Sequence, residues 1–181
     1  PRSEYNVKVL ITGKGGQLAW ELENSVGGDH QLILLSRKEL DISDADSVEQ
    51  SIVLYQPDLV INAAAYTAVD KAETEQERAF AVNDIGAKNL AFACKKHGCR
   101  LLHLSTDFVF DGTKPTPYQT DDAVNPLGVY GASKLAGDLG VMQILPNSVI
   151  VRTAWVYSQH GNNFVKTMLR LMAEKPQLGI V

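Results

Sequence analysis

Short apolar runs alternate along the chain with longer segments in which apolar residues recur at helical spacing. Five of the runs have the length of strands, and we expect these strands at 7–12, 31–36, 58–63, 100–105 and 148–153. The runs are apolar nearly throughout, which is typical of parallel strands that helices cover on both faces. The pattern predicts an α/β fold with a doubly wound parallel sheet.

The segments between the strands carry the helical pattern. Helices are expected at 16–26, 44–55, 74–97, 128–145 and 161–175. Ser43 precedes the second of these, where its hydroxyl can cap the first amides, and Gly98 ends the third. The stretch 111–128 contains three prolines and is therefore predicted to be a loop. A long loop near the end of a sheet is usually functional.

Length, charge and cysteine content exclude several classes of function. The 181 residues give room for one domain with a sizeable core. No apolar run approaches the roughly 20 residues of a membrane span, and we find no secretory signal, so we expect a cytoplasmic protein without a membrane partner. A net charge of −4 without a long basic run argues against nucleic-acid binding. Cys94 and Cys99 match no zinc spacing and are expected to be buried and reduced.

The first predicted strand runs into a glycine-rich turn, "TGKGGQLA" (12–19). Gly13, Gly16 and Ala19 fit the pattern G-x-x-G-x-x-A at the opening of a helix. The first glycine permits the tight turn, the second lets backbone amides approach a pyrophosphate, and the small third residue lets the helix pack on the strand. The strand–turn–helix context distinguishes this site from an ordinary turn, and it predicts a Rossmann-type dinucleotide-binding domain.

The end of the second predicted strand bears on the choice of dinucleotide. Proteins selective for NAD usually place an acidic residue about 20 residues beyond the glycine turn. This chain offers Ser36 and Arg37 instead, a hydroxyl and a guanidinium that would bind a 2′-phosphate. NADPH is therefore the expected cofactor. NADH is the alternative if Arg37 is only a solvated loop residue, and Asp41 could still approach the adenine ribose.

Candidate catalytic groups lie at one strand end and on the helix that follows. Strand 100–105 runs into Thr106 and Asp107, at the sheet edge where open α/β sheets bind ligands. Tyr130 and Lys134 lie one helical turn apart. A nearby ammonium lowers the pKa of a tyrosine, so Tyr130 could protonate a carbonyl oxygen as hydride reaches its carbon, while Thr106 bonds the developing alkoxide. The Tyr/Lys spacing alone is common, but together with the glycine turn it predicts carbonyl reduction.

Six segments in order resemble the dTDP-4-dehydrorhamnose reductase family of extended short-chain dehydrogenase/reductases: "GKGGQLAWEL", "PDLVINAAAYTAVDKAE", "AVNDIGAKNLA", "STDFVFDG", "VYGASKLAGD" and "RTAWVYSQHGNNFVKTMLRL". The resemblance implies an oxidoreductase that uses NADPH, with NADH as the alternative. Its substrate would be the C4 ketone of dTDP-6-deoxy-L-lyxo-4-hexulose and its product dTDP-L-rhamnose, which feeds bacterial polysaccharide biosynthesis.

The resemblance also implies roles for individual residues. It makes Thr106, Tyr130 and Lys134 the catalytic residues. It places Asp107, Phe108 and Trp155 at the substrate, with ordinary packing as the alternative for Trp155. The residues expected at the cofactor, besides Tyr130 and Lys134, are Gly13, Gly15, Gly16, Gln17, Leu18, Ser36, Arg37, Asp41, Ile42, Ala63, Ala64 and Ala65.

Several positions qualify the resemblance. The family usually has tyrosine where this chain has Phe108, which bears on affinity for the sugar or on its identity. Asn83 is expected to be a structural hydrogen-bonding residue. Glu21 matches a magnesium position of some relatives, but we expect no bound metal here and a solvated role for Glu21. A homodimer is left open.

The family continues beyond the length of this chain. We expect residues 1–176 to form the NADP-binding domain with the catalytic residues, and 177–181 to begin a smaller C-terminal substrate domain that is otherwise missing. NADP(H) binding should then survive while turnover is weak or absent. Two alternatives stay open: a non-catalytic NADP-binding subunit like the regulatory subunit of methionine adenosyltransferase, and another nucleotide-sugar reductase or epimerase.

Overall fold

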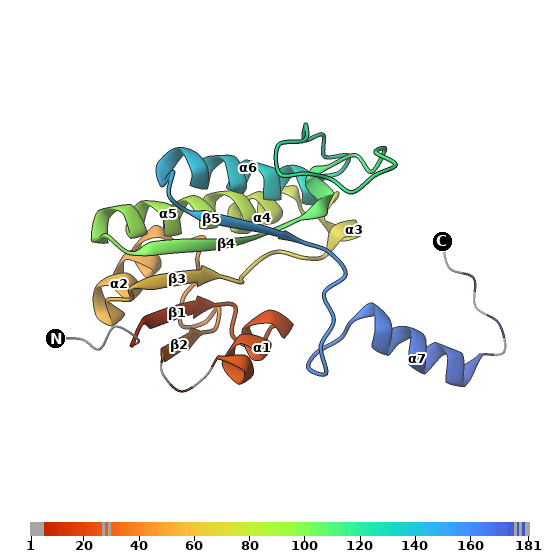
Figure 1. The fold of residues 1–181 in the computed structure, drawn as a ribbon, viewed down its shortest axis with the longest axis horizontal. Helices are drawn as coiled ribbons and strands as arrows, with labels where there is room; N and C mark the ends of the chain where they lie inside the picture. The colour runs from red at the N-terminus through yellow and green to blue at the C-terminus, as the bar shows by residue number, and fades with distance from the viewer. Residues whose placement is uncertain (1–5, 27, 29, 176, 178, 180–181) are drawn as a thin grey trace.

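Five parallel strands form a single sheet. The computed structural model describes residues 6–26, 28, 30–175, 177 and 179, and the strands lie in the order β2-β1-β3-β4-β5 (Figure 1). Their bounds are β1 (Lys8–Thr12), β2 (Gln31–Leu35), β3 (Leu59–Asn62), β4 (Arg100–Thr106) and β5 (Val149–Thr153). Each predicted strand is present to within one residue at either end. The predicted α/β class is confirmed.

The helices divide the chain more finely than the sequence pattern predicts. They are α1 (Gln17–Ser25), α2 (Ala45–Tyr55), α3 (Val69–Ala72), α4 (Gln76–Phe80), the π-helix η1 (Ala81–Ile85), α5 (Gly86–His97), the 3-10 helix η2 (Asp107–Val109), α6 (Val129–Ile144) and α7 (Phe164–Glu174). The helix expected over 74–97 is therefore α4, η1 and α5 in succession, and α3 was not expected. None of the described helices is both long and apolar enough to cross a bilayer.

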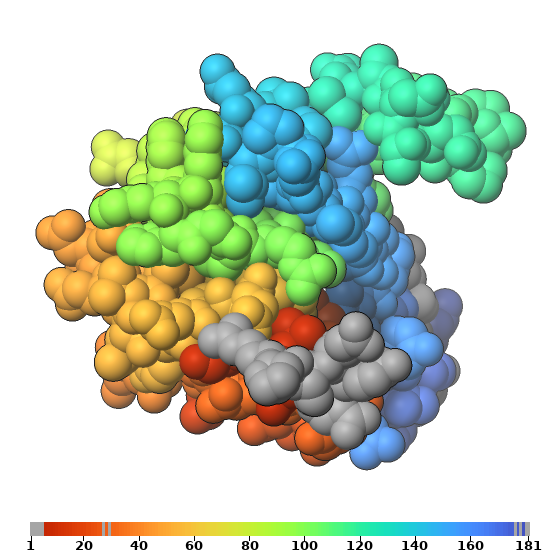
Figure 2. Space-filling model, turned by 60° about the vertical axis from the view of Figure 1, so that its left-hand side comes forward, coloured from red at the N-terminus to blue at the C-terminus, as the bar shows by residue number. Residues whose placement is uncertain are grey.

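Helices cover both faces of the sheet, as the sequence predicts. On one face, Leu10, Val60 and Leu101 of the strands pack in the same core as residues of α2, α5 and α6. On the other face, Val9 and Ile11 pack against α1 through Ala19. Figure 2 shows α5 and α6 side by side in the outer layer, with the 111–128 loop projecting beyond α6. The two layers leave the carboxyl ends of the strands open.

The prediction that every strand is buried on both faces is wrong for β5. Val149 and Val151 are exposed. They share a face with Leu102 and Leu104 of β4, opposite the face that α6 covers. Helix α1 covers only β1, β2 and β3 on that side of the sheet, so its apolar surface does not reach this edge.

The start of α2 differs from the predicted cap. The Asp44 carboxylate, not the Ser43 hydroxyl, accepts from the amides of Asp46 and Ser47. Ser43 instead donates to Asp41 at 2.6 Å. A carboxylate is the stronger acceptor at the positive end of a helix, which accounts for the exchange. The predicted end of α5 at Gly98 is confirmed, since Gly98 has φ +71°.

Helix α7 extends away from the sheet (Figure 1). It begins three residues later than expected, where the Asn163 side chain accepts from the amide of Lys166. The second domain expected to begin over 177–181 falls on residues of which only 177 and 179 are described, so it stays a prediction. Cys94 and Cys99 are buried and free, as predicted.

Candidate active site

A cleft of about 780 Å³ opens at the carboxyl ends of the strands. The chain leaves β1 to form β2 on one side, whereas β3 pairs with β1 on the other side. Ligands of open α/β sheets bind at such a switch point. The cleft is lined by the turn after β1, the segment after β3, the end of β4 with η2, the first turns of α6, and the loop after β5.

The glycine turn has the geometry of an anion cradle. Gly13 and Gly15 have φ +78° and +92°, values that favour glycine. A Cβ at position 13 would lie 2.9 Å from the Ala63 carbonyl oxygen. Helix α1 begins after Gly16 with no side-chain cap and no acidic residue in its first turn. The backbone amides of its first turn can therefore donate hydrogen bonds to a bound anion.

The structure brings the predicted cofactor residues together, with one exception. Those that line the cleft are Gly13, Gly15, Gly16, Gln17, Leu18, Arg37, Asp41, Ile42, Ala63, Ala64, Ala65, Tyr130 and Lys134. Ser36 is not among the lining residues, and its hydroxyl donates to Glu39 at 2.7 Å. Arg37 pairs with Asp41 at 3.2 Å. Hydrogen bonds from Ser43 keep the pKa of Asp41 below its usual value, so Arg37 faces an ionised carboxylate.

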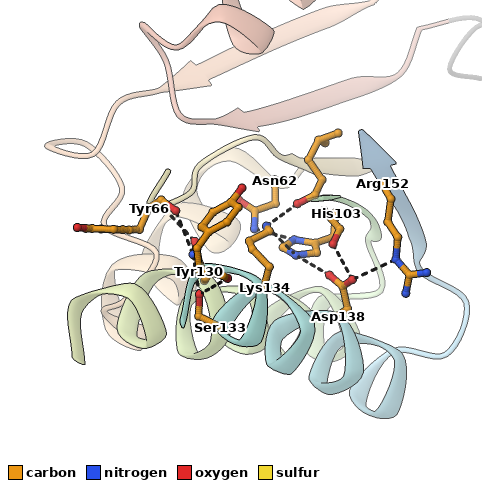
Figure 3. Close-up of polar contacts among 11 residues, drawn as sticks. Asn62, Tyr66, His103, Tyr130, Ser133, Lys134, Asp138 and Arg152 are labelled. Atoms are coloured by element: carbon orange, nitrogen blue, oxygen red, sulfur yellow. Dashed lines mark hydrogen bonds and ion pairs between the residues drawn. The ribbon is translucent and has the colours of Figure 1, made fainter. Parts of the chain in front are cut away.

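The three predicted catalytic residues line the same cleft from two elements. Thr106 ends β4, while Tyr130 and Lys134 project from the first turns of α6 (Figure 3). The helix lies so close to η2 that a Cβ at Gly131 would be 2.2 Å from the Phe108 carbonyl oxygen. The glycine beside Tyr130 therefore sets the depth at which the tyrosine enters the cleft.

The expectation that the pKa of Tyr130 lies below its usual value is wrong for this structure. Burial raises the pKa of Tyr130, and a hydrogen bond with Thr106 only partly opposes the rise. The Lys134 Nζ is engaged elsewhere, because it donates to the Leu104 carbonyl at 2.6 Å. Burial lowers the pKa of Lys134 to about 8. At neutral pH Tyr130 thus keeps its proton and can act as an acid.

Asn83 is structural, as predicted, and joins two walls of the cleft. Its side chain accepts from the Tyr66 amide at 2.9 Å, donates to the Tyr66 carbonyl at 3.1 Å and donates to Ser133 Oγ at 3.0 Å. Ser133 in turn donates to the Tyr130 carbonyl. Asn83 lies in the π-helix η1, and such turns are frequent at functional sites. It fixes the segment after β3 against α6.

Asp107, Phe108 and Trp155, the residues expected at the substrate, also line the cleft. Phe108 is 49% exposed and meets the Tyr130 ring edge-on at 5.5 Å. Trp155 is 75% exposed with φ +53°, a strained conformation for a large side chain. It contacts Phe164 of α7 but is not packed in the core. The alternative of ordinary packing for Trp155 is not supported.

Glu21 is not the solvated residue that the sequence suggests. It accepts a hydrogen bond from Ser158 in the loop after β5. His160 of the same loop lies 3.0 Å from the Gly15 carbonyl, and Asn163 donates to Gln17 at 2.9 Å. These contacts hold the loop beside the glycine turn. No group of three or more His, Cys, Asp or Glu side chains suited to a metal occurs within the described ranges.

Sequence reasoning missed a set of buried polar residues behind the cleft. They are Thr12, Asn62, His103 and Asp138, to which the half-buried Arg152 adds a charge. Two signals could have revealed part of this set. His103 and Ser105 alternate on one side of a strand that is otherwise apolar, and Asp138 follows Lys134 by one helical turn.

The chain is similar in sequence to a well-defined group of proteins. A family model described as the RmlD substrate binding domain matches residues 7–181. A dTDP-4-dehydrorhamnose reductase of Sinorhizobium fredii is 46% identical over 175 residues, 97% of this chain and 59% of that protein. One from Aggregatibacter actinomycetemcomitans is 45% identical over 176 residues, 96% of this chain and 60% of that protein. The chain thus spans about 60% of the length of these curated relatives.

Solved structures give the same picture. The dTDP-4-dehydrorhamnose reductase of Bacillus anthracis in complex with NADP superimposes with a TM-score of 0.91 at 40% identity, covering 94% of this chain and 61% of that one. A reductase ortholog from Clostridium acetobutylicum gives 0.89 at 43% identity, over 92% of this chain and 60% of that one.

Proposed function

The chain belongs to the RmlD substrate binding domain family, and from this premise we propose that it forms the cofactor-binding and catalytic part of a dTDP-4-dehydrorhamnose reductase. The reaction would be the NADPH-dependent reduction of the C4 ketone of dTDP-6-deoxy-L-lyxo-4-hexulose to dTDP-L-rhamnose. One observation carries the proposal: the glycine turn, Thr106, Tyr130 and Lys134 line a single cleft. The relative from Bacillus anthracis, whose structure is in complex with NADP, supports it.

The cleft fits a dinucleotide. The open space at Gly15 and the uncapped amides at the start of α1 suit a pyrophosphate. Ala63, Ala64 and Ala65 follow β3 along one wall and leave room beside the sheet edge. Lys134 can donate to a ribose hydroxyl with an Nζ proton that Leu104 does not take. When bound, NADPH supplies the hydride.

The residues of the chain handle the proton. Tyr130 donates its phenolic proton to the ketone oxygen as that oxygen becomes a hydroxyl, which leaves a phenolate on the tyrosine. The Lys134 ammonium, one turn along α6, stabilises that phenolate. Thr106 Oγ1, which donates to Asp107 at 3.1 Å, would turn to the substrate oxygen instead.

We also propose residues 1–176 as the cofactor-binding and catalytic domain, because the strands and the cleft-lining residues among the described residues lie within them. The proposed compartment is the cytoplasm, since Cys94 and Cys99 are free as in proteins of reducing compartments. The proposed small-molecule partner is the dTDP-ketosugar.

The preference for NADPH is expected to depend on Arg37. Replacing it with alanine should weaken NADPH binding by about tenfold, because a charge-assisted bond to the 2′-phosphate is lost. Binding of NADH, which lacks that phosphate, should change little. Titration of each dinucleotide by fluorescence checks this, with Lys38→Ala as the control for loss of a neighbouring charge. An equal loss for both dinucleotides would show that Arg37 does not read the phosphate.

The reductase proposal is tested with a protein that contains this chain and is as long as the full-length relatives. It is mixed with NADPH and the dTDP-ketosugar. Absorbance of the reduced nicotinamide should fall only when the ketosugar is present, and dTDP-L-rhamnose should accumulate. Tight NADPH binding without consumption would reject the reductase and favour the non-catalytic binding subunit. A different sugar product would assign the chain to another member of the extended group.

A further inference from the structure

Three ionisable side chains are buried together behind the cleft, between β4, β5 and α6 (Figure 3). Lys134 is 2% exposed, His103 1% and Asp138 0%. The Lys134 Nζ makes its contacts with neutral groups, the Leu104 carbonyl at 2.6 Å and His103 Nε2 at 3.4 Å. A buried ammonium is costly unless a negative charge compensates it.

A chain of three hydrogen bonds fixes which His103 ring nitrogen is the acceptor. The Ala64 amide donates to Thr12 Oγ1 at 3.1 Å, and the Thr12 hydroxyl donates to Asn62 Oδ1 at 2.7 Å. The Asn62 amide nitrogen therefore lies toward His103 Nδ1, 3.0 Å away. An amide nitrogen can only donate, so Nδ1 is the acceptor. A neutral His103 then carries its proton on Nε2.

The imidazole Nε2 faces the buried carboxylate. It lies 3.5 Å from Asp138 Oδ1, an oxygen that accepts no hydrogen bond. The other oxygen, Oδ2, accepts from Ser105 Oγ at 2.6 Å and lies 3.7 Å from Arg152 Nε. Both oxygens thus face donors, which is the arrangement of an ionised carboxylate.

The electrostatics agree with a neutral imidazole between two charges. Burial, and then the Lys134 charge, lower the pKa of His103 to about 3. Burial raises the pKa of Asp138, while the Ser105 hydrogen bond and the charges of Lys134 and Arg152 oppose that rise. Tyr130, also on α6, is another titratable group near Lys134. The charge of Asp107 in η2 raises the pKa of Tyr130.

We propose that Asp138 is a positioning residue: its carboxylate, which the Nε2–H of neutral His103 faces, is the buried counter-charge that keeps Lys134 an ammonium at the base of the cleft. The use of that ammonium in carbonyl reduction rests on the proposed function. The arrangement of charges and protons does not, so it can be tested without cofactor or substrate.

The first measurement uses the unmodified protein without ligands. Nitrogen-15 NMR of the histidine rings, with His103 assigned by its loss in His103→Gln, should show one neutral Nε2–H form from about pH 6 to about pH 9. Carbon-13 NMR of the Asp138 carboxyl should show it ionised at neutral pH. An Nδ1–H tautomer, an imidazolium near neutrality or a protonated Asp138 would overturn the proposal.

The second measurement follows the Lys134 side chain by carbon-13 NMR, assigned by its absence in Lys134→Met. Loss of the charge in Asp138→Asn should lower the Lys134 pKa by about one unit or more, because the proton is then less well compensated. Asp138→Glu should restore most of the pKa. Asp84→Asn is the matched control, since Asp84 is also a buried carboxylate but pairs with Lys88, at 2.6 Å.

An unchanged Lys134 pKa in folded Asp138→Asn would overturn the proposal. If that variant does not fold, the tautomer and carboxyl measurements on the unmodified protein still decide the question. None of these readouts depends on turnover, so a chain that binds no dTDP-ketosugar would refute the proposed reaction and leave this inference standing.

Discussion

Replacing Gly137 with alanine is expected to destabilise the fold by about 3 kcal/mol, because the new methyl group has no space. A Cβ at this position would lie 2.1 Å from the backbone oxygen of Asn83 and 3.2 Å from its carbonyl carbon. The Asn83 backbone cannot shift easily, because the Asn83 side chain is hydrogen-bonded to Tyr66 and Ser133. The added methyl group would force α6 and η1 apart.

Gly140, one turn along the same helix, provides the matched control. The three atoms nearest to a Cβ there, at 2.3 to 3.0 Å, belong to the Lys88 side chain, which can shift more easily than a backbone. Gly140→Ala should therefore be nearly neutral or stabilising by up to about 1 kcal/mol, the gain in helix propensity. Urea unfolding followed by circular dichroism measures both variants. Equal losses at the two positions would show that the contact with Asn83 does not limit how closely the helices pack.

Removing the Tyr130 hydroxyl is expected to have the largest effect on chemistry. Tyr130→Phe should lower ketosugar-dependent consumption of NADPH by about 10²- to 10⁴-fold, the usual contribution of a positioned general acid. NADPH binding should change little, because the ring and its edge-on contact with Phe108 are retained. The comparison is made in the assay that tests the reductase, with cofactor binding titrated separately.

Tyr118→Phe is the control for this substitution. Tyr118 stacks on Phe110 and donates to Asp111 in the loop over 111–128, and it does not line the cleft. Its loss of a hydroxyl should leave turnover nearly unchanged. Undiminished turnover in Tyr130→Phe would remove Tyr130 from the proposed role and direct attention to Thr106 as the group that holds the substrate oxygen.

Local patterns were sufficient for most of the framework. Continuous apolar runs located all five strands, although helices cover β5 on one face only. The pattern failed at η1, where α4 passes into a π-helix. The apolar spacing of 74–97 is compatible with one continuous helix, and the bonds from Asn83 to Tyr66 and Ser133 join it to distant segments.

The sequence did not correctly predict how the fold shifts the pKa of Tyr130. The spacing of Tyr130 and Lys134 correctly predicted two side chains on one helix face, but it suggested that the ammonium would lower the tyrosine pKa. Burial raises the pKa of Tyr130 instead, and the Lys134 Nζ donates to the Leu104 carbonyl of β4. Desolvation depends on everything packed around a group, and no local spacing encodes it.

The sequence by itself determined the doubly wound sheet, the glycine turn and the spacing of Tyr130 and Lys134, because each depends on the geometry of consecutive residues. Only the tertiary structure decided that Ser36 turns to Glu39, that Glu21 holds the loop after β5, and that His103 and Asp138 meet behind Lys134. Residues of β4 and α6 more than thirty positions apart become neighbours only when the sheet and its helices pack. Their protons and charges are set by that packing.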